Sequence, residues 1–185
     1  NRKLIKVRQE KENINNFEEK IFFKDYQNDF VERVSLINEN FEKSLAFGFR
    51  GSKLGFSKNV KNVIYGNLGK SNKTNIIYDE ELIPFKESSL DLIMSFFNLH
   101  FANDVPGILY QTLSSLKPNG LFIASMFCEN TLQELNYSFI KAEEEICGGM
   151  SPRVSPFAKL QALASLMQEI NFSLPVADIH RQSVY

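Results

Sequence analysis

The stretch that decides the fold reads Leu90-Asp91-Leu92-Ile93-Met94-Ser95-Phe96-Phe97 and continues, after an amphipathic segment, with Leu121-Phe122-Ile123-Ala124. Two nearly unbroken apolar runs of this length are typical of strands covered on both faces in a parallel sheet. Residues 104–116 between them carry apolar residues at helical spacing, with a proline near the first turn. Strand, helix and strand in this order predict an α/β fold with a doubly wound, mostly parallel sheet.

Shorter apolar runs on the amino-terminal side extend the sheet. Residues 44–49, 62–65 and 75–78 predict three further strands, each bounded by turn residues. Residues 1–43 instead predict a helical arm with one narrow apolar face. We therefore expect an arm over 1–43 and an α/β domain over 44–185.

Two helices and a last strand are predicted after this core. Thr131 with Glu134 three places on forms a capping box, and Ser155-Pro156 marks the start of a second helix. Residues 176–185 alternate like a strand that is cut short, so we expect the domain to lack its last strand. An open sheet edge can pair with another chain, which makes a homodimer a candidate assembly.

Composition excludes several classes of protein. The 185 residues are 43% apolar, enough for one domain with a core, and 21 Lys and Arg nearly balance 22 Asp and Glu. The charge balance argues against a nucleic-acid partner, and no run reaches the roughly 18 apolar residues that span a membrane. Cys128 and Cys147 lack the spacing of a disulfide framework or a metal site. We predict a cytoplasmic protein, with one or both ends trimmed because the chain begins on Asn1 and stops on Tyr185.

Four motifs carry a resemblance to a known family. They read Asp79-Glu80-Glu81-Leu82-Ile83-Pro84-Phe85, Leu90-Asp91-Leu92-Ile93-Met94-Ser95, Asn98-Leu99-His100-Phe101 and Leu116-Lys117-Pro118-Asn119-Gly120-Leu121. Together they resemble the hallmarks of class I S-adenosylmethionine-dependent methyltransferases. The resemblance implies a Rossmann-like fold with a cofactor site at the carboxyl edge of its sheet.

A further run points to one branch of that family. Gly148-Gly149-Met150-Ser151-Pro152-Arg153-Val154-Ser155-Pro156-Phe157, preceded by Thr131-Leu132 and Glu134-Leu135, resembles the branch with the malonyl-carrier-protein methyltransferase of biotin synthesis and a mitochondrial complex I assembly factor. The assembly factor is the closer match. This branch implies a protein or carrier-protein substrate, and for the assembly factor arginine hydroxylation is a further reaction class.

The resemblance assigns candidate cofactor residues to S-adenosylmethionine. Gly48 and Gly51 correspond to the glycine turn after the first strand, Asn67 to the ribose position, and Asp79 and Glu80 to the adenine position. Asn98 follows the fourth predicted strand and reaches the same edge. A carboxylate normally grips the ribose diol with two acceptors, whereas an asparagine offers a single oxygen.

The first half of this site departs from the family pattern. Ala46 replaces the leading acid of the glycine turn, and Arg50 replaces its middle glycine. Residues 66–74, which join the second and third predicted strands, are fewer than the dozen or so that a parallel crossover usually needs. Residues 52–61 are equally short. We therefore predict an eroded cofactor site, in which Arg50 fills the cleft or binds an anion.

Two other residues are candidates for contact with a substrate or partner. His100 follows a buried strand and could act as a base, although the same residue could simply pack the strand against the next helix. Arg153 lies in a loop rich in glycine and proline and offers a bidentate donor, and a structural turn is an equal alternative. The sequence identifies no catalytic base.

Two functions from different classes remain open at this stage. One is a methyltransferase that uses S-adenosylmethionine on a carboxyl group or a protein, since methyl transfer can proceed by positioning alone. The other is a non-catalytic assembly or interaction factor built on a decayed methyltransferase fold.

Overall fold

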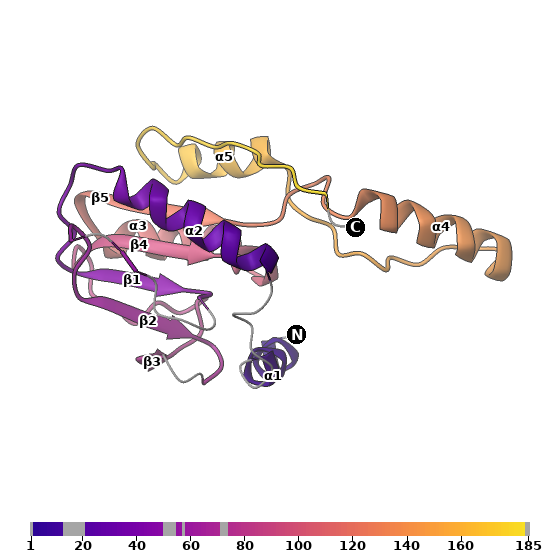
Figure 1. Ribbon diagram of the computed structural model, residues 1–185, viewed down its shortest axis with the longest axis horizontal. Coiled ribbons are helices and arrows are strands. Elements are labelled where there is room, and N and C mark those ends of the chain that lie inside the picture. Colours follow the sequence, from indigo (N-terminus) through magenta and orange to yellow (C-terminus); the bar gives the residue numbers. More distant parts are fainter. Residues whose placement is uncertain (1, 13–20, 50–54, 57, 71–73, 184–185) are drawn as a thin grey trace. The chain divides into compact units, whose positions relative to one another are not determined.

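The computed structural model describes residues 2–12, 21–49, 55, 56, 58–70 and 74–183. The chain divides into two compact units, Asn1–Met126 and Phe127–Tyr185. The amino-terminal unit contains a sheet with flanking helices (Figure 1). No helix of the described residues is long and apolar enough to cross a membrane.

The sheet has five parallel strands in the order β3-β2-β1-β4-β5. Their bounds are β1 Ser44–Phe47, β2 Val63–Asn67, β3 Ile76–Ile77, β4 Leu90–Phe96 and β5 Leu116–Ser125. Because all five strands are parallel, their carboxyl ends lie at one edge of the sheet. The strand order changes direction between β1 and β4, which is the point where ligands of doubly wound sheets bind. The prediction of a doubly wound parallel sheet is confirmed.

Strand β1 forms the centre of the unit, and all four of its residues are buried. Ala46 pairs in register with Tyr65 of β2 on one side and with Met94 of β4 on the other. Both edges of β1 are thus hydrogen-bonded and both faces are covered. The apolar run Leu45-Ala46-Phe47 agrees with that double burial, and Ser44 is a buried polar residue at the start of the strand.

The described residues of this unit also form three helices and a short 3-10 turn: α1 Arg2–Glu12, α2 Ile21–Ser35, α3 Val105–Ser115 and η2 Leu99–Phe101. Phe30 of α2 packs edge-on against Phe96 of β4, with ring centroids 5.7 Å apart, and Val34 is fully buried. The predicted helix at 104–116 is confirmed by α3. The Asp104 side chain caps this helix by accepting the Gly107 N–H at 2.8 Å.

Strand β5 begins earlier than the sequence pattern indicated. The segment Lys117-Pro118-Asn119-Gly120, which precedes the apolar run at 121–124, lies within β5, and the register with β4 shifts between Leu90 and Leu92. Asn119 adopts a positive φ of 64°, which a short polar side chain tolerates. The turn residues therefore produce a bulge inside the strand.

The carboxyl-terminal unit contains α4 (Gln133–Cys147) and α5 (Leu160–Glu169). The predicted capping box is wrong, because Leu132 in a left-handed conformation precedes α4 and no side chain caps it. The second helix starts at Leu160 rather than at Ser155, since the Glu129 carboxylate accepts the Leu160 N–H at 2.8 Å. The hydrogen-bond acceptor at the start of α5 thus comes from the remote Glu129, and not from Ser155 as the local sequence pattern indicated.

The predicted last strand is not observed. Residues 176–183 are irregular, and Val176 is 94% exposed. Alternation of apolar residues favours a strand only where a neighbouring strand pairs with its backbone, and no strand does so here among the described residues.

Asp91, near the amino end of β4, forms hydrogen bonds with two lysine residues. Its carboxylate accepts the Lys43 backbone N–H at 2.9 Å and the Lys117 ammonium at 2.7 Å. Burial raises the pKa of Asp91, but the hydrogen bonds from Lys117 and from the backbone of Lys43 and Glu42 outweigh it, so the net pKa lies below its ordinary value. A carboxyl with a depressed folded-state pKa stabilises the fold above its unfolded pKa and loses that contribution as pH falls.

We expect Asp91→Asn to lower the free energy of unfolding by about 1 kcal/mol at pH 7, because a partly exposed ion pair and a charge-assisted hydrogen bond are lost. Urea titrations followed by circular dichroism measure this difference. It should shrink as the pH falls below the ordinary aspartate pKa of 3.8, where the wild-type carboxylate becomes protonated. Glu42→Gln, which breaks only an exposed pair with Lys61, is the matched control and should change stability little. A constant difference between pH 7 and pH 2 would contradict the role of the charge.

Candidate functional site

The predicted cofactor residues that the structure describes meet at the carboxyl edge of the sheet. Gly48 follows β1, Asn67 ends β2, the pair Asp79-Glu80 follows β3, and Asn98 follows β4. Parallel strands leave their carboxyl ends at one edge, so residues 50 positions apart in the sequence become neighbours. Their role in binding a cofactor remains a prediction.

Gly48 is the point where the chain leaves β1. Its φ is +81°, and a Cβ at this position would lie 2.2 Å from the Phe96 carbonyl oxygen and 2.8 Å from the Asn98 Cβ. Both the backbone angle and the available space therefore require glycine. The close approach brings the ends of β1 and β4 into direct contact.

Asn67 links the ends of β1 and β2. Its Oδ1 accepts the Gly48 N–H at 3.1 Å, and its Nδ2 donates to the Phe49 carbonyl at 3.3 Å and to the Thr74 hydroxyl at 3.3 Å. The residue is 7% exposed. Its amide group therefore holds the turn after β1, which is a structural role in addition to the predicted ribose contact.

Glu80 and Asn98 form a buried polar pair across the ends of β3 and β4. They are 3% and 2% exposed, and the Asn98 Nδ2 donates to Glu80 Oε1 at 2.7 Å. A buried carboxylate needs partners for both oxygens, because an unpaired charge in the interior is costly. Asn98 supplies one of these partners.

Arg2 of α1 supplies the other. Its Nη2 lies 2.7 Å from Glu80 Oε2 and also hydrogen-bonds to Asp79 Oδ1, while its Nε donates to Asp79 Oδ2 at 3.2 Å. Glu81 lies at the rim, 3.9 Å from Nε. One guanidinium thus holds both carboxylates that the resemblance assigns to the adenine.

The ion pairs shift the titration of both partners. Burial lowers the pKa of Arg2, but hydrogen bonds to Asp79 and Glu80 outweigh it, so the guanidinium pKa is raised. Burial raises the pKa of Asp79, but the hydrogen bonds from Arg2 and from the Glu81 N–H outweigh it, so the net pKa is lowered. Both groups are charged at neutral pH.

Three buried polar atoms in or beside this cluster have no hydrogen-bond partner among the described residues. They are Arg2 Nη1, Asn98 Oδ1 and the Tyr78 hydroxyl. Burial and then the charge of Glu80 raise the pKa of Tyr78, so its hydroxyl stays neutral and keeps its proton. The edge therefore offers one acceptor, Asn98 Oδ1, and two donors, the Tyr78 hydroxyl and Arg2 Nη1, that no described side chain uses.

Aromatic side chains close the same edge from the side of α2. Phe97 adopts a positive φ of 42°, which is uncommon for a bulky residue. Its ring meets Phe96, Tyr26 and Phe23 edge-on, with centroids 4.9, 5.5 and 5.6 Å apart. These contacts hold the backbone that leads directly into Asn98.

The remaining predicted residues do not all join this cluster. Gly51 and Arg50 lie outside the described residues. Ala46 is buried within β1, one residue before the strand ends. His100 lies in η2, partly exposed, with its ring 4.1 Å from Phe101.

Arg153 belongs to the carboxyl-terminal unit and contacts α4. Its Nε donates to Glu143 Oε1 at 2.5 Å, and the Ser151 N–H donates to Glu143 Oε2 at 2.7 Å. The hydrogen bonds from the Ser151 N–H and from Arg153 lower the pKa of Glu143. In this structure Arg153 therefore pins the glycine-rich loop to α4, and a contact with a substrate stays a prediction.

Sequence reasoning missed two residues of the cluster, Arg2 and Tyr78. Tyr78 could have been found, because it ends the predicted strand at 75–78, directly before the candidate acids. Arg2 carries no local signal, since it pairs with a carboxylate 77 positions away.

The connection from β2 to β3 is short. Residues 68–75 join the two strands, and their described part contains no helix. The wall that a crossover helix would give to a nucleoside site is absent from the described residues of this connection. The length therefore agrees with what the sequence led us to expect.

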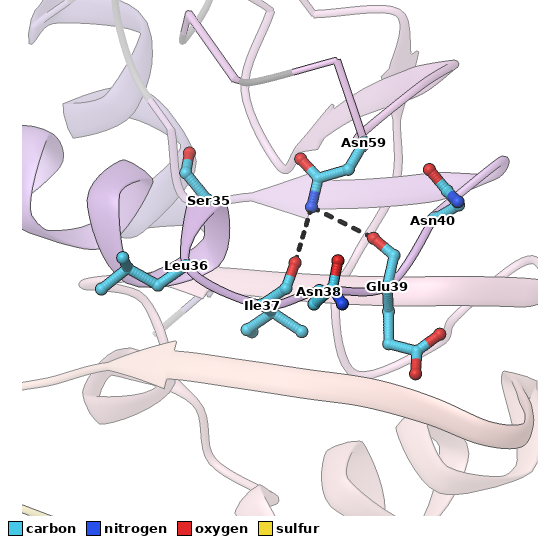
Figure 2. A pocket seen from close by; sticks show the side chains of 7 residues that line it. All are labelled: Ser35, Leu36, Ile37, Asn38, Glu39, Asn40 and Asn59. Atoms are coloured by element: carbon cyan, nitrogen blue, oxygen red, sulfur yellow. Dashed lines mark hydrogen bonds between the residues drawn. The ribbon is translucent and has the colours of Figure 1, made fainter.

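A separate hollow of about 320 Å³ lies at the opposite edge of the sheet (Figure 2). Residues 35–40 before β1 and Asn59 before β2 line it, and the Asn59 side chain donates to the carbonyls of Ile37 and Glu39 at 3.0 and 3.1 Å. Ligands of doubly wound sheets bind beyond the carboxyl ends of the strands. The hollow is thus not part of the candidate cofactor site.

Known protein sequences identify relatives of this chain. Residues 58–124 match the methyltransferase domain family. The human protein named arginine-hydroxylase NDUFAF5, mitochondrial, is 43% identical over 103 residues, which are 56% of this chain and 30% of that protein. The malonyl-[acyl-carrier protein] O-methyltransferase of Xylella fastidiosa is 30% identical over 104 residues, 56% of this chain and 33% of that protein. The chain spans only about a quarter to a third of the length of such relatives.

Solved structures share the fold. A SAM-dependent methyltransferase from Thermotoga maritima superposes with a TM-score of 0.57 at 15% identity, over 86% of this chain and 78% of that one. The phosphoethanolamine N-methyltransferase 2 of Haemonchus contortus, in complex with S-adenosylhomocysteine, gives a TM-score of 0.55 at 15% identity, over 80% and 37%. The resemblance seen in the sequence is confirmed over residues 58–124, and the solved methyltransferases share the fold of this chain.

Gly48→Ala should destabilise the amino-terminal unit strongly, by about 3 kcal/mol or more, because the new methyl group meets a backbone carbonyl and the positive φ adds strain. Gly55→Ala is the matched control, since a Cβ there meets nothing within 4 Å. Thermal unfolding of the two variants measures the difference. Equal melting temperatures would show that the ends of β1 and β4 are not in close contact.

Proposed function

We propose that this chain binds S-adenosylmethionine, or its demethylated product, at the carboxyl edge of β1 to β4 and acts on a side chain of a protein. The observation that carries the proposal is the buried, unpartnered Oδ1 of Asn98 beside Glu80. A buried acceptor without a partner is unusual unless a ligand or water completes it. The methyltransferase-family relatives supply the chemical class of that ligand.

The residues at this edge fit an adenosyl group. Asn98 Oδ1 can accept a hydrogen bond from an amino or hydroxyl group, and the Tyr78 hydroxyl can donate one. The carboxylates of Asp79 and Glu80 would accept further hydrogen bonds after Arg2 releases them. Asn67 would meet the ribose with whatever capacity its three protein hydrogen bonds leave. When bound, S-adenosylmethionine supplies an activated methyl group, and the protein's task is to hold it in line with an acceptor.

The site is weaker than the family pattern, in the sense that a carboxylate is missing at the ribose position. Replacing a charge-assisted hydrogen bond with a neutral one costs roughly 1.5 to 3 kcal/mol, or about ten- to a hundredfold in affinity. We therefore expect weak cofactor binding, with a dissociation constant well above that of a site with the acid.

The relatives support a proposal for the substrate class. Relatives named arginine-hydroxylase NDUFAF5 are 39–43% identical to this chain, whereas the malonyl-carrier-protein methyltransferases are 29–30% identical. A protein side chain is thus the favoured substrate and a carrier-protein thioester is the second choice. His100 beside Asn98 and Arg153 on the loop after α4 are the proposed contacts with substrate or partner.

A non-catalytic assembly or interaction factor is the second candidate function. Two observations favour it: Arg2 already engages both candidate adenine acids, and the described part of the β2–β3 connection contains no helix. In that case the cofactor edge would be eroded and the fold retained as a binding module. A cytoplasmic location and a homodimer remain predictions, and the NDUFAF5 relatives are named as mitochondrial.

Isothermal titration calorimetry with S-adenosylhomocysteine, S-adenosylmethionine, adenosine and methionine separates the two functions. We expect heat with both S-adenosyl compounds and a weaker response to adenosine. A hundredfold excess of ligand over its dissociation constant should add about 2.7 kcal/mol to the free energy of unfolding. Absence of heat and of any thermal shift at millimolar ligand would favour the non-catalytic factor.

Variants locate the binding site. Asn98→Ala should weaken binding about tenfold, because it removes the unpartnered acceptor and one partner of Glu80. Glu39→Gln changes the hollow at the opposite edge and should leave the dissociation constant unchanged. Circular dichroism checks that both variants are folded. Equal affinities for wild type and Asn98→Ala would place the ligand elsewhere.

A further inference from the structure

The candidate site already contains an internal ligand, the guanidinium of Arg2. All four carboxylate oxygens of Asp79 and Glu80 have partners: three meet Arg2, and Glu80 Oε1 accepts from Asn98. The Arg2 side chain is 17% exposed and that of Glu80 is 4% exposed. The contact is therefore a partly buried, charge-assisted clamp and not a surface ion pair.

The clamp uses the acceptors that an adenosyl group would use. Each carboxylate oxygen can accept two hydrogen bonds, and here Arg2, Asn98 and the Glu81 N–H together already donate at least one to every oxygen of the two acids. Asn98 is 2% exposed, and its Oδ1, which has no partner among the described residues, belongs to the amide group bonded to Glu80. A ligand acceptor point thus remains beside carboxylates that the protein itself has occupied.

From this geometry we infer that α1 acts as a gate on the nucleoside site. While Arg2 binds Asp79 and Glu80, the gate is closed, because a nucleoside must compete with Arg2 for these carboxylates. A nucleoside gains the acids only when α1 releases them, so its apparent affinity is the intrinsic affinity reduced by the fraction of molecules in which the clamp is open. Whatever binds α1, such as a partner with an acidic surface, would favour the open state by engaging Arg2. The inference rests on the proposed cofactor site.

Electrostatic repulsion among the carboxylates opposes the opening of the gate. The cluster combines one guanidinium with three carboxylates, counting Glu81 at the rim, so opening leaves three like charges at one edge. A pair that is partly shielded from water is screened by salt less than an exposed pair, but still measurably. We therefore expect salt to loosen α1 and to raise the nucleoside affinity.

Arg2→Ala tests the gate, with Arg8→Ala as the matched control. Both residues are arginines of α1, and Arg8 is exposed. Hydrogen exchange of the Arg2–Glu12 segment should be several-fold faster in Arg2→Ala than in wild type or Arg8→Ala. Asp79→Asn should speed the same exchange. Calorimetry should give an S-adenosylhomocysteine affinity about tenfold tighter for Arg2→Ala only.

The outcomes separate this inference from the proposed function. If wild type and Arg2→Ala bind S-adenosylhomocysteine equally well, the cofactor site stands and the gate is wrong. If Arg2→Ala binds more weakly, Arg2 is part of the binding site and the gate is likewise wrong. If neither binds, the proposed function fails and the gate fails with it, even where the exchange of α1 increases. Tighter binding together with faster exchange supports both.

Discussion

The double burial of β1 fixes where every described candidate functional residue of the amino-terminal unit lies. The strand pairs with β2 and β4 along both edges and exposes none of its residues. A chain that leaves such a strand must turn at once, and the Phe96 carbonyl leaves room only for a glycine at position 48. Asn67 then caps the turn and Asn98 follows beside it. The candidate site is a consequence of how the central strand ends.

The carboxyl edge of the sheet must meet two requirements that conflict with each other. Buried carboxylates need positively charged or donating partners to be stable, and a nucleoside site needs acceptors that are free to meet the ligand. In this protein Arg2 and Asn98 satisfy the first requirement completely at Glu80. The second requirement can then be met only by exchanging one partner for another, which links the stability of the apoprotein to the affinity for its ligand.

Much of the fold could be predicted from the sequence because local patterns carried it. The apolar runs at 90–97 and 121–124 marked strands β4 and β5, and Asp104 with Pro106 marked the start of α3. Only β4 is covered as expected, since residues 121–123 of β5 are partly exposed and Ala124 is exposed. Predictions failed where the deciding partner is remote. Glu129 sets the start of α5, and the irregular segment 176–183 has no strand to pair with among the described residues. The same reason explains why the resemblance could indicate Asp79, Glu80 and Asn98, whereas the Arg2 clamp was invisible to any local pattern.

The left-handed backbone of Phe97 has a consequence for motion at the edge. Such a conformation costs a bulky residue on the order of 1 kcal/mol or more, and here rings from α2 hold it in place. Subglobal opening of α2 would release that strain and let Asn98 relax, while the hydrogen-bonded strands stay intact. The edge should therefore lose its order at a lower free energy than the sheet, as a cooperative unit of its own.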